Sequence, residues 1–229
     1  MKDVRLLAFD ADDTLWDNQS HFDKAVDDYC RLLSCYGSID QMYKELYKTE
    51  CGNMESLGYG TKAFIISLVE NLVRVSDGKA PDQMIQDAVN IGRQILDNPA
   101  VPLEGVKETL QALKAKGKYR MVIFTKGDPL EQEAKIARSG LGEFFEDVEI
   151  VGNKTALEYG RLCRHNAVKP EEFAMIGNSF KSDIAPALAI GCTAVHIPFH
   201  LTWELEQTQV FDHPHLHSIT HFAELLQIL

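Results

Sequence analysis

The stretch "LLAFDADDTLWDN", residues 6–18, decides how the rest of the chain is interpreted. A short apolar run leads directly into Asp10, Asp12 and Asp13. Runs that are apolar at consecutive positions are typical of strands buried on both faces, as in parallel sheets covered by helices. Side chains two residues apart on an extended backbone point the same way, so we expect Asp12 on the side of Asp10. The stretch therefore predicts a buried strand that ends in paired carboxylates.

The same pattern recurs along the chain and predicts the fold class. Buried strands are expected at 4–9, 119–124, 147–151, 172–176 and 192–197. Helical patterns lie between them at 104–116, 129–140, 154–166 and 182–190, with Pro129 at a start and glycines at several ends. Strands that alternate with helices indicate an α/β fold with a doubly wound, mostly parallel, Rossmann-like sheet.

One long segment departs from this alternation. Residues 16–98 are almost wholly helical in pattern, with helices expected near 20–36, 38–51, 61–75 and 82–96. The segment ends at "DNPAVPLEG", where two prolines stop a helix and favour an extended link. We therefore predict an α/β core made of residues 1–15 and 99–229, interrupted by a helical domain at 16–98.

Composition excludes several classes of partner. The chain has 229 residues, 45% of them hydrophobic, and a formal net charge of −11, so we expect neither nucleic acid polymers nor membranes as partners. The five cysteines form no CxxC pair, which indicates reduced thiols. The N-terminal sequence resembles neither a signal peptide nor a membrane anchor, so a cytoplasmic protein is expected.

Polar residues follow each expected strand, and ligands of open α/β sheets bind at these carboxyl ends. A single such residue is often only a helix cap. Lys154 fits that explanation poorly, because a helix dipole opposes a cation at the start of a helix. The position of Lys154 therefore predicts a nearby negative charge. The set comprises Asp10 and Asp12; Thr125, Lys126, Gly127 and Asp128; Asn153 and Lys154; and Gly177, Asn178, Ser179 and Asp183.

Taken together, these groups suit a magnesium ion held against a phosphate. Mg²⁺ prefers oxygen ligands and is usually bound by one or two carboxylates together with substrate phosphate oxygens. A carboxylate that approaches a phosphate is repelled, so a metal and a lysine are needed to neutralise the charge. If Asp10 attacks phosphorus, a second acid such as Asp12 must protonate the leaving group and later activate water.

The motifs "FDADDTLWD" (9–17), "IFTKGD" (123–128), Lys154 and "GNSFKSDI" (177–184) resemble, in order, those of the haloacid dehalogenase superfamily, chiefly its magnesium-dependent phosphatases. The resemblance implies that Asp10 is the nucleophile and Asp12 the general acid and base. It also implies that Thr125 donates to the phosphoryl group and that Lys154 stabilises negative charge. Lys126 is expected to bind substrate beside Thr125.

The resemblance also implies a metal site and a cap. Mg²⁺ would be held by Asp10, the main-chain carbonyl of Asp12, and the motif around Asn178 and Asp183. The family pattern usually has aspartate where this sequence has Asn178, which predicts weaker metal binding. The helical insertion matches the family's cap, which closes over the site and selects the leaving group. Within it, "LGYGTKAF" (57–64) predicts a substrate loop carrying Tyr59 and Lys62.

The expected function is hydrolysis of a small phosphorylated cytosolic metabolite, with nucleoside monophosphates slightly favoured over sugar phosphates. A haloacid dehalogenase, a phosphonate-cleaving enzyme that uses Lys62 and a phosphomutase are the alternatives within the superfamily. Carbon–halogen displacement needs neither a proton shuttle nor a metal site. A receiver-like signalling module is disfavoured by the chain order, and a catalytically weak binding or regulatory homologue has only Asn178 in its favour.

Overall fold

The computed structural model describes residues 3–229, which form two compact units. The first consists of the chain up to Gln19 together with Ala100–Leu229, and the second of Ser20–Pro99. The first unit thus extends beyond residue 15, where the sequence analysis placed the boundary. The reason is that Leu15 and Trp16 are fully buried in the hydrophobic core of the first unit.

The first unit contains a six-stranded sheet in which every neighbouring pair is parallel. Its order is β3-β2-β1-β4-β5-β6, so the chain runs outward from β1 to one edge and then returns to build the other. The carboxyl ends of β1 and β4 flank the point where this direction reverses, which is where open α/β sheets bind ligands. The strands are β1 (Leu6–Phe9), β2 (Arg120–Lys126), β3 (Asp147–Val151), β4 (Phe173–Gly177), β5 (Thr193–His196) and β6 (Leu216–Ser218).

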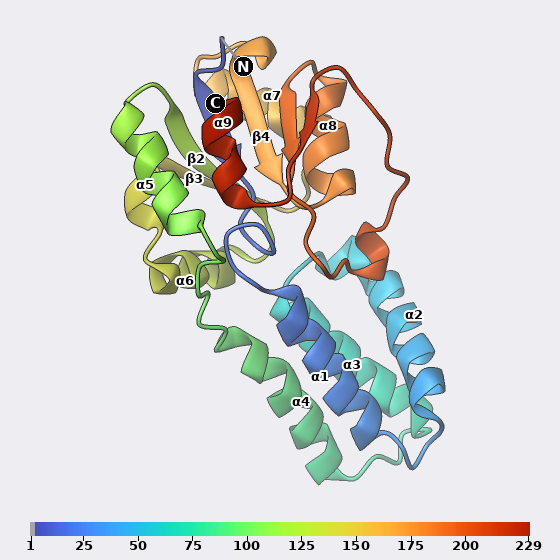
Figure 1. Ribbon diagram of the computed structural model, residues 1–229. Helices are drawn as coiled ribbons and strands as arrows, with labels where there is room; N and C mark the ends of the chain where they lie inside the picture. The colour runs from blue at the N-terminus through green and yellow to red at the C-terminus, as the bar shows by residue number, and fades with distance from the viewer. Residues whose placement is uncertain (1–2) are drawn as a thin grey trace. The chain divides into compact units, whose positions relative to one another are not determined.

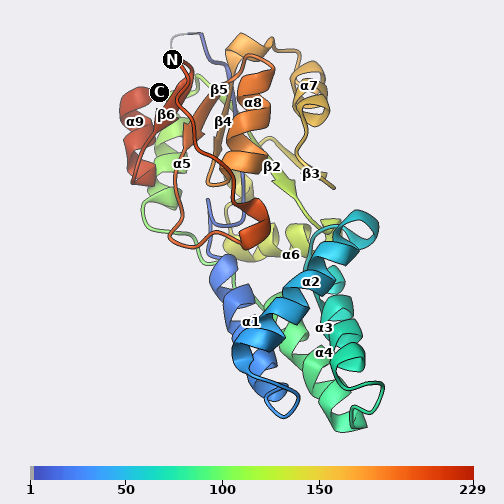
Figure 2. The ribbon, with the colours of Figure 1, turned by 90° about the vertical axis from the view of Figure 1, so that its right-hand side faces the viewer.

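Helices cover both faces of this sheet (Figures 1 and 2). Leu7 and Phe9 of β1 pack with residues of α5, α6 and α9, whereas Leu6 and Ala8 pack with α7 and α8. Alternate residues of one strand therefore serve two apolar layers, which explains why the strand is apolar at every position. The helices are α5 (Val106–Lys116), α6 (Pro129–Ser139), α7 (Ala156–His165), α8 (Ala185–Ala189) and α9 (Leu225–Ile228).

The second unit is helical. It is built from α1 (Gln19–Leu32), α2 (Ile39–Leu57), α3 (Thr61–Val75) and α4 (Asp82–Leu96). Its core contains Tyr29, Leu46 and Leu68. The buried Tyr29 hydroxyl donates to the main-chain carbonyl of Leu68 at 2.7 Å, so the one polar atom of this large side chain is satisfied inside the core.

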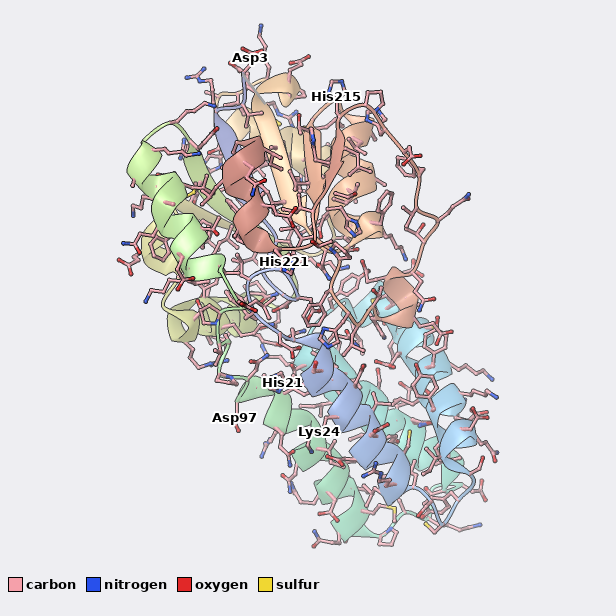
Figure 3. The ribbon with its side chains drawn as sticks, viewed as in Figure 1. Asp3, His21, Lys24, Asp97, His215 and His221 are labelled. Atoms are coloured by element: carbon pink, nitrogen blue, oxygen red, sulfur yellow. The ribbon has the colours of Figure 1, made fainter. Side chains whose placement is uncertain are left out.

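The α/β fold class is confirmed, and most helices and strands lie close to their expected ranges. The segment expected as one helix at 182–190 instead begins as a π-helical turn, Phe180–Ile184, before the short α8. Exposed polar side chains occur on both units, among them Asp3 and His215 on the first and Lys24 and Asp97 on the second (Figure 3). Within residues 3–229, none of the helices has the length and apolar character needed to span a membrane.

Candidate active site

Asp10 lies directly after β1 in the middle of the sheet, and its amide donates to the carbonyl of Ile176 at 2.9 Å. Its carboxylate Oδ1 accepts a hydrogen bond from Nζ of Lys154, which also donates to Oδ1 of Asp183 at 2.6 Å. All three residues are buried. Burial, and next the Asp183 carboxylate, raise the pKa of Asp10 to about 7. Lys154 therefore sits between two carboxylates, as its position before a helix predicted.

The pKa of Lys154 shows how strongly the two carboxylates act on it. Burial lowers the pKa of an amine, but the charges of Asp10 and Asp183 outweigh that effect and raise the pKa of Lys154 above its usual value. The lysine is thus held in its charged form at the carboxyl ends of β1 and β4. A buried cation in this position is suited to neutralise charge on a nucleophile and on a bound phosphate.

Thr14 connects the first strand to the fourth. Its hydroxyl lies 3.1 Å from Oδ2 of Asp10 and 3.2 Å from Oδ1 of Asn178. A hydroxyl has one proton, so Thr14 serves only one of these two oxygens at a time. A carboxylate oxygen and an amide oxygen therefore converge here with one hydrogen-bond donor between them. Mg²⁺ prefers hard oxygen ligands of this kind, so the residues present fit that ion.

Asp183 has a supporting position in this cluster. Oδ1 of its carboxylate accepts from Lys154, and Oδ2 accepts from the amide of Ser179 at 2.9 Å. Gly177 makes room for it, because a Cβ atom at that position would lie 2.3 Å from Oδ2 of Asp183. Its contacts thus hold Lys154 and the loop after β4 in place.

Asp12 is surrounded by hydrogen-bond donors. Nζ of Lys135 lies 2.7 Å from both carboxylate oxygens of Asp12. Nε1 of Trp16 donates to Oδ1 at 2.8 Å, and Nε2 of Gln132 donates to Oδ2 at 2.9 Å. Asp10 and Asp12 therefore have different lysines as partners.

Asp13 has a structural role in the same stretch. Its φ angle is +63°, a conformation in which aspartate is better tolerated than most residues. Its Oδ1 accepts hydrogen bonds from the amides of Asn18 and Gln19, both at 2.8 Å. Burial raises the pKa of Asp13 to about 7. The residue turns the chain out of the sheet and caps the start of α1.

Thr125 and Lys126 end β2, as expected. The Thr125 hydroxyl is buried and accepts from Nε2 of Gln132 at 3.2 Å. Nζ of Lys126 pairs with Glu206 at 2.5 Å and donates to the Ser182 hydroxyl at 2.9 Å. A substrate anion that binds Lys126 would therefore compete with Glu206. Asp128, another residue of the expected set, caps α6 by accepting from the amide of Glu131 at 3.1 Å.

Tyr59 and Lys62 belong to the second unit. Tyr59 lies in the connection between α2 and α3, where Gly58 and Gly60 have φ angles of +69° and +115°. Such angles favour glycine, so the connection has a defined shape. Lys62 lies in the first turn of α3. Contact of Tyr59 and Lys62 with substrate stays a prediction.

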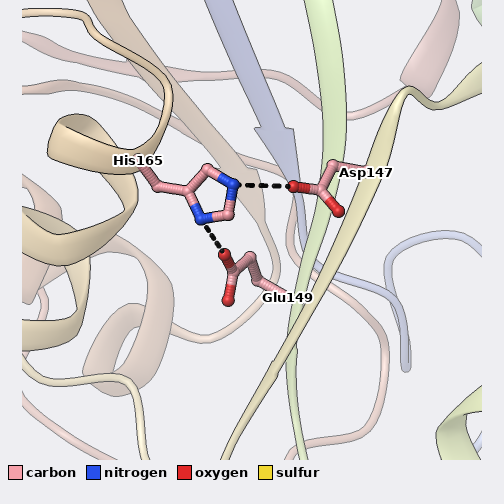
Figure 4. A group of neighbouring side chains, drawn as sticks. All are labelled: Asp147, Glu149 and His165. Carbon is pink, nitrogen blue, oxygen red and sulfur yellow. Dashed lines mark ion pairs between the residues drawn. The ribbon is translucent and has the colours of Figure 1, made fainter.

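A second cluster of ionisable groups lies on β3 and α7, apart from the strand ends described above (Figure 4). Nδ1 of His165 is 3.0 Å from Oε1 of Glu149, and Nε2 is 3.5 Å from Oδ2 of Asp147. These are residue types that bind metals, and their ligand atoms lie within 4.8 Å of one another. The two ring nitrogens face different carboxylates, however, so this arrangement links the helix α7 to the edge strand β3.

Gln132, Lys135 and Glu206, which are partners of Asp12 and Lys126, are not among the residues expected from the sequence. Gln132 and Lys135 lie three residues apart on α6, a spacing that places both on one helix face, and their polar character on a core-facing stripe was the available signal. Glu206 ends a single 3₁₀ turn, Glu204–Glu206, which is too short for a periodic sequence pattern to mark it.

Comparisons with known proteins agree with this geometry. A family model described as haloacid dehalogenase-like hydrolase matches residues 4–191. A glyceraldehyde 3-phosphate phosphatase from Pyrococcus furiosus is 26% identical over 100% of this chain and 94% of its own length. A protein of the same name from Methanothermobacter thermautotrophicus is 31% identical over 48% of this chain and 50% of its own length.

Solved structures are also similar to this chain. A haloacid dehalogenase-like family hydrolase from Xanthomonas campestris is 32% identical, with a TM-score of 0.88 over 99% of this chain and 91% of that one. An L-2-haloacid dehalogenase from Xanthobacter autotrophicus has a TM-score of 0.65 over 98% of both chains at 16% identity, which shows a shared fold alone.

Proposed function

The chain belongs to the haloacid dehalogenase-like hydrolases, and we propose that it is a magnesium-dependent phosphomonoester hydrolase that works through an aspartyl-phosphate intermediate. The observation that carries this proposal is the pairing of Asp10 with the buried Lys154 at the end of the central strand. Asp12, two residues further on, supplies the second carboxylate that phosphate transfer to water requires. The curated relatives are all named as phosphatases, which supports the same class of reaction.

In the first step, an oxygen of Asp10 attacks the phosphorus of the monoester. The bond from phosphorus to the leaving oxygen breaks, and the carboxyl proton of Asp12 passes to that oxygen. Lys154 offsets the negative charge of the nucleophile and the phosphoryl group, and Thr125 donates to a phosphoryl oxygen.

In the second step, water attacks phosphorus while the Asp12 carboxylate accepts a proton from the water. The bond between phosphorus and Asp10 breaks, which releases phosphate, restores the Asp10 carboxylate and leaves the proton on the Asp12 carboxyl group. Asp10, the main-chain carbonyl of Asp12, and the motif around Asn178 and Asp183 would hold Mg²⁺, and the ion would supply further positive charge near the phosphoryl group.

We propose a small phosphorylated metabolite as the substrate. The name shared by the curated relatives makes glyceraldehyde 3-phosphate the first compound to test, and nucleoside monophosphates remain the class favoured by the sequence analysis. We further propose that the helical unit, Ser20–Pro99, is the cap that selects the leaving group, with Tyr59 and Lys62 as substrate contacts. The shaped connection between α2 and α3 supports this assignment.

The test is phosphate release from p-nitrophenyl phosphate and from a metabolite panel. We expect turnover with added Mg²⁺ and its loss with EDTA. Replacing the nucleophile in Asp10→Asn should lower kcat by at least about 1,000-fold. Asp212→Asn makes the same chemical change at an exposed position of the first unit and should leave turnover unchanged. Full activity of Asp10→Asn, or full activity in EDTA, would contradict the mechanism.

A further inference from the structure

The face that α6 turns toward the core is unusually polar. Its buried residues are Glu131, Gln132, Lys135 and Ile136, of which only Ile136 is apolar. A helix that covers a sheet normally buries an apolar stripe. Burying a charged or polar group is costly unless that group is paired. The buried polar residues of α6 therefore need hydrogen-bond or ion-pair partners, and their contacts identify these partners.

These partners converge on one carboxylate. Lys135 lies 2.7 Å from each oxygen of Asp12, with only 2% of its side chain exposed. Gln132 donates to the same carboxylate at 2.9 Å. The Trp16 indole, fully buried, adds a third donor at 2.8 Å. Because these donors come from fixed helix and core positions, they restrict the Asp12 side chain to one orientation.

Lys135 is itself held from two further sides. Its Nζ donates to Oδ1 of Asn18 at 3.1 Å and lies 3.7 Å from Oε1 of the buried Glu131. Stability alone gives little reason for such a group, since apolar residues of similar volume often replace a buried ion pair without loss. The buried lysine is better explained by what it does to Asp12.

We propose that Lys135, assisted by Gln132, is a positioning residue that holds the Asp12 carboxyl group for proton transfer. The inference rests on the proposed function, in which the Asp12 carboxyl gives its proton to the leaving oxygen as the bond from phosphorus breaks, and the resulting carboxylate later takes a proton from water. Lys135 acts only through Asp12. Small displacements of a proton donor cost rate, so orientation by Lys135 matters most where the leaving oxygen needs the proton.

The dependence on the leaving group separates this role from a structural one. We would measure kcat/KM with Mg²⁺ for p-nitrophenyl phosphate, whose leaving group departs readily without a proton, and for β-glycerophosphate, whose alkoxide needs one. In Lys135→Met, kcat/KM for β-glycerophosphate should fall by at least about tenfold more than kcat/KM for p-nitrophenyl phosphate. Lys135→Arg keeps the charge and should restore most of the loss. Arg138→Met removes an exposed cation from the same helix and should change neither value.

Equal losses for both substrates, or none, would overturn the inference, because a merely structural role predicts no dependence on the leaving group. If Lys135→Met does not fold, Gln132→Met removes another donor to Asp12 and must show the same selective loss. Absence of phosphate release by the wild-type protein would instead refute the proposed function, and the inference would fall with it.

Discussion

Replacing Gly177 with alanine is expected to break the ion pair between Lys154 and Asp183 without altering either residue. The alanine Cβ would lie 2.3 Å from Oδ2 and 2.4 Å from Cγ of Asp183, well inside van der Waals contact. Asp183 has no easy way to move aside, because Lys154 and the Ser179 amide hold its two oxygens. The strain must therefore be relieved by displacing the carboxylate or the end of β4.

The size of the effect follows from these contacts. Overpacking a buried position costs about 1–3 kcal/mol, and breaking a buried ion pair from one side costs about 3–5 kcal/mol. The two costs describe one displacement and do not add, so we expect a loss of about 2–5 kcal/mol in the free energy of unfolding of the first unit. Gly152→Ala is the matched control, since it also follows a strand but its Cβ would meet no atom within 4 Å.

Urea unfolding followed by tryptophan fluorescence measures this loss selectively. Both tryptophans of the chain, Trp16 and Trp203, belong to the first unit, so the signal reports its unfolding. Phosphatase activity should fall together with stability, because Lys154 loses one of its two carboxylate partners. If Gly177→Ala destabilises the unit by no more than Gly152→Ala does, the carboxylate is not held as tightly as its contacts indicate.

Two further predictions concern the helical unit. Burial raises the pKa of Glu50 to about 7. The contribution of Glu50 to the free energy of unfolding is therefore complete below its ordinary pKa of 4.5 and is lost as the pH rises through 7. Glu50→Gln should therefore raise the free energy of unfolding, measured by thermal denaturation, by at most about 3 kcal/mol at pH 8 and have little effect at pH 4.5. An equal effect at both pH values would refute this. At the contact between α3 and α4, Gly92→Ala places Cβ 2.3 Å from Cγ1 of Ile65 and should cost about 1–3 kcal/mol. Gly52→Ala, in α2 with nothing within 4 Å, should instead stabilise by up to about 1 kcal/mol in the same denaturation assay, and matching signs for the two variants would contradict the packing argument.

Most of the sheet was predictable because its signals are local. Strands β1, β2 and β4 are largely apolar and buried, and α6 and α7 each follow a strand after a short connection, so periodicity and breakers locate them. The π-helical turn Phe180–Ile184 was not predictable in this way. It forms because the amides of Asp183 and Ile184 both donate to the carbonyl of Ser179, a geometry that depends on where Asp183 must point.

The site was predictable only in part for a related reason. Positions after strands indicate which side chains gather at the sheet edge, and they led to Asp10, Thr125, Lys154 and Asp183. They do not indicate which group pairs with which, because pairing depends on packing between elements far apart in the chain. Lys135, 123 residues from Asp12, lies well inside a helix rather than after a strand. Its effect on the site comes from the helix face it occupies.

The proposed mechanism gives separate tasks to Asp10 and Asp12, which are only two residues apart in sequence, and their different partners support this division. Within the opening stretch, contacts four residues apart already distinguish them, since Thr14 lies against Asp10 and Trp16 donates to Asp12. The fold then adds one buried lysine to each, Lys154 from the segment before α7 and Lys135 from α6. Electrostatic attraction falls with distance, so each lysine acts more strongly on the carboxylate that it contacts than on the other. In the proposed mechanism, the nucleophile and the proton carrier therefore belong to two separate ion pairs, and changing one lysine should disturb one task more than the other.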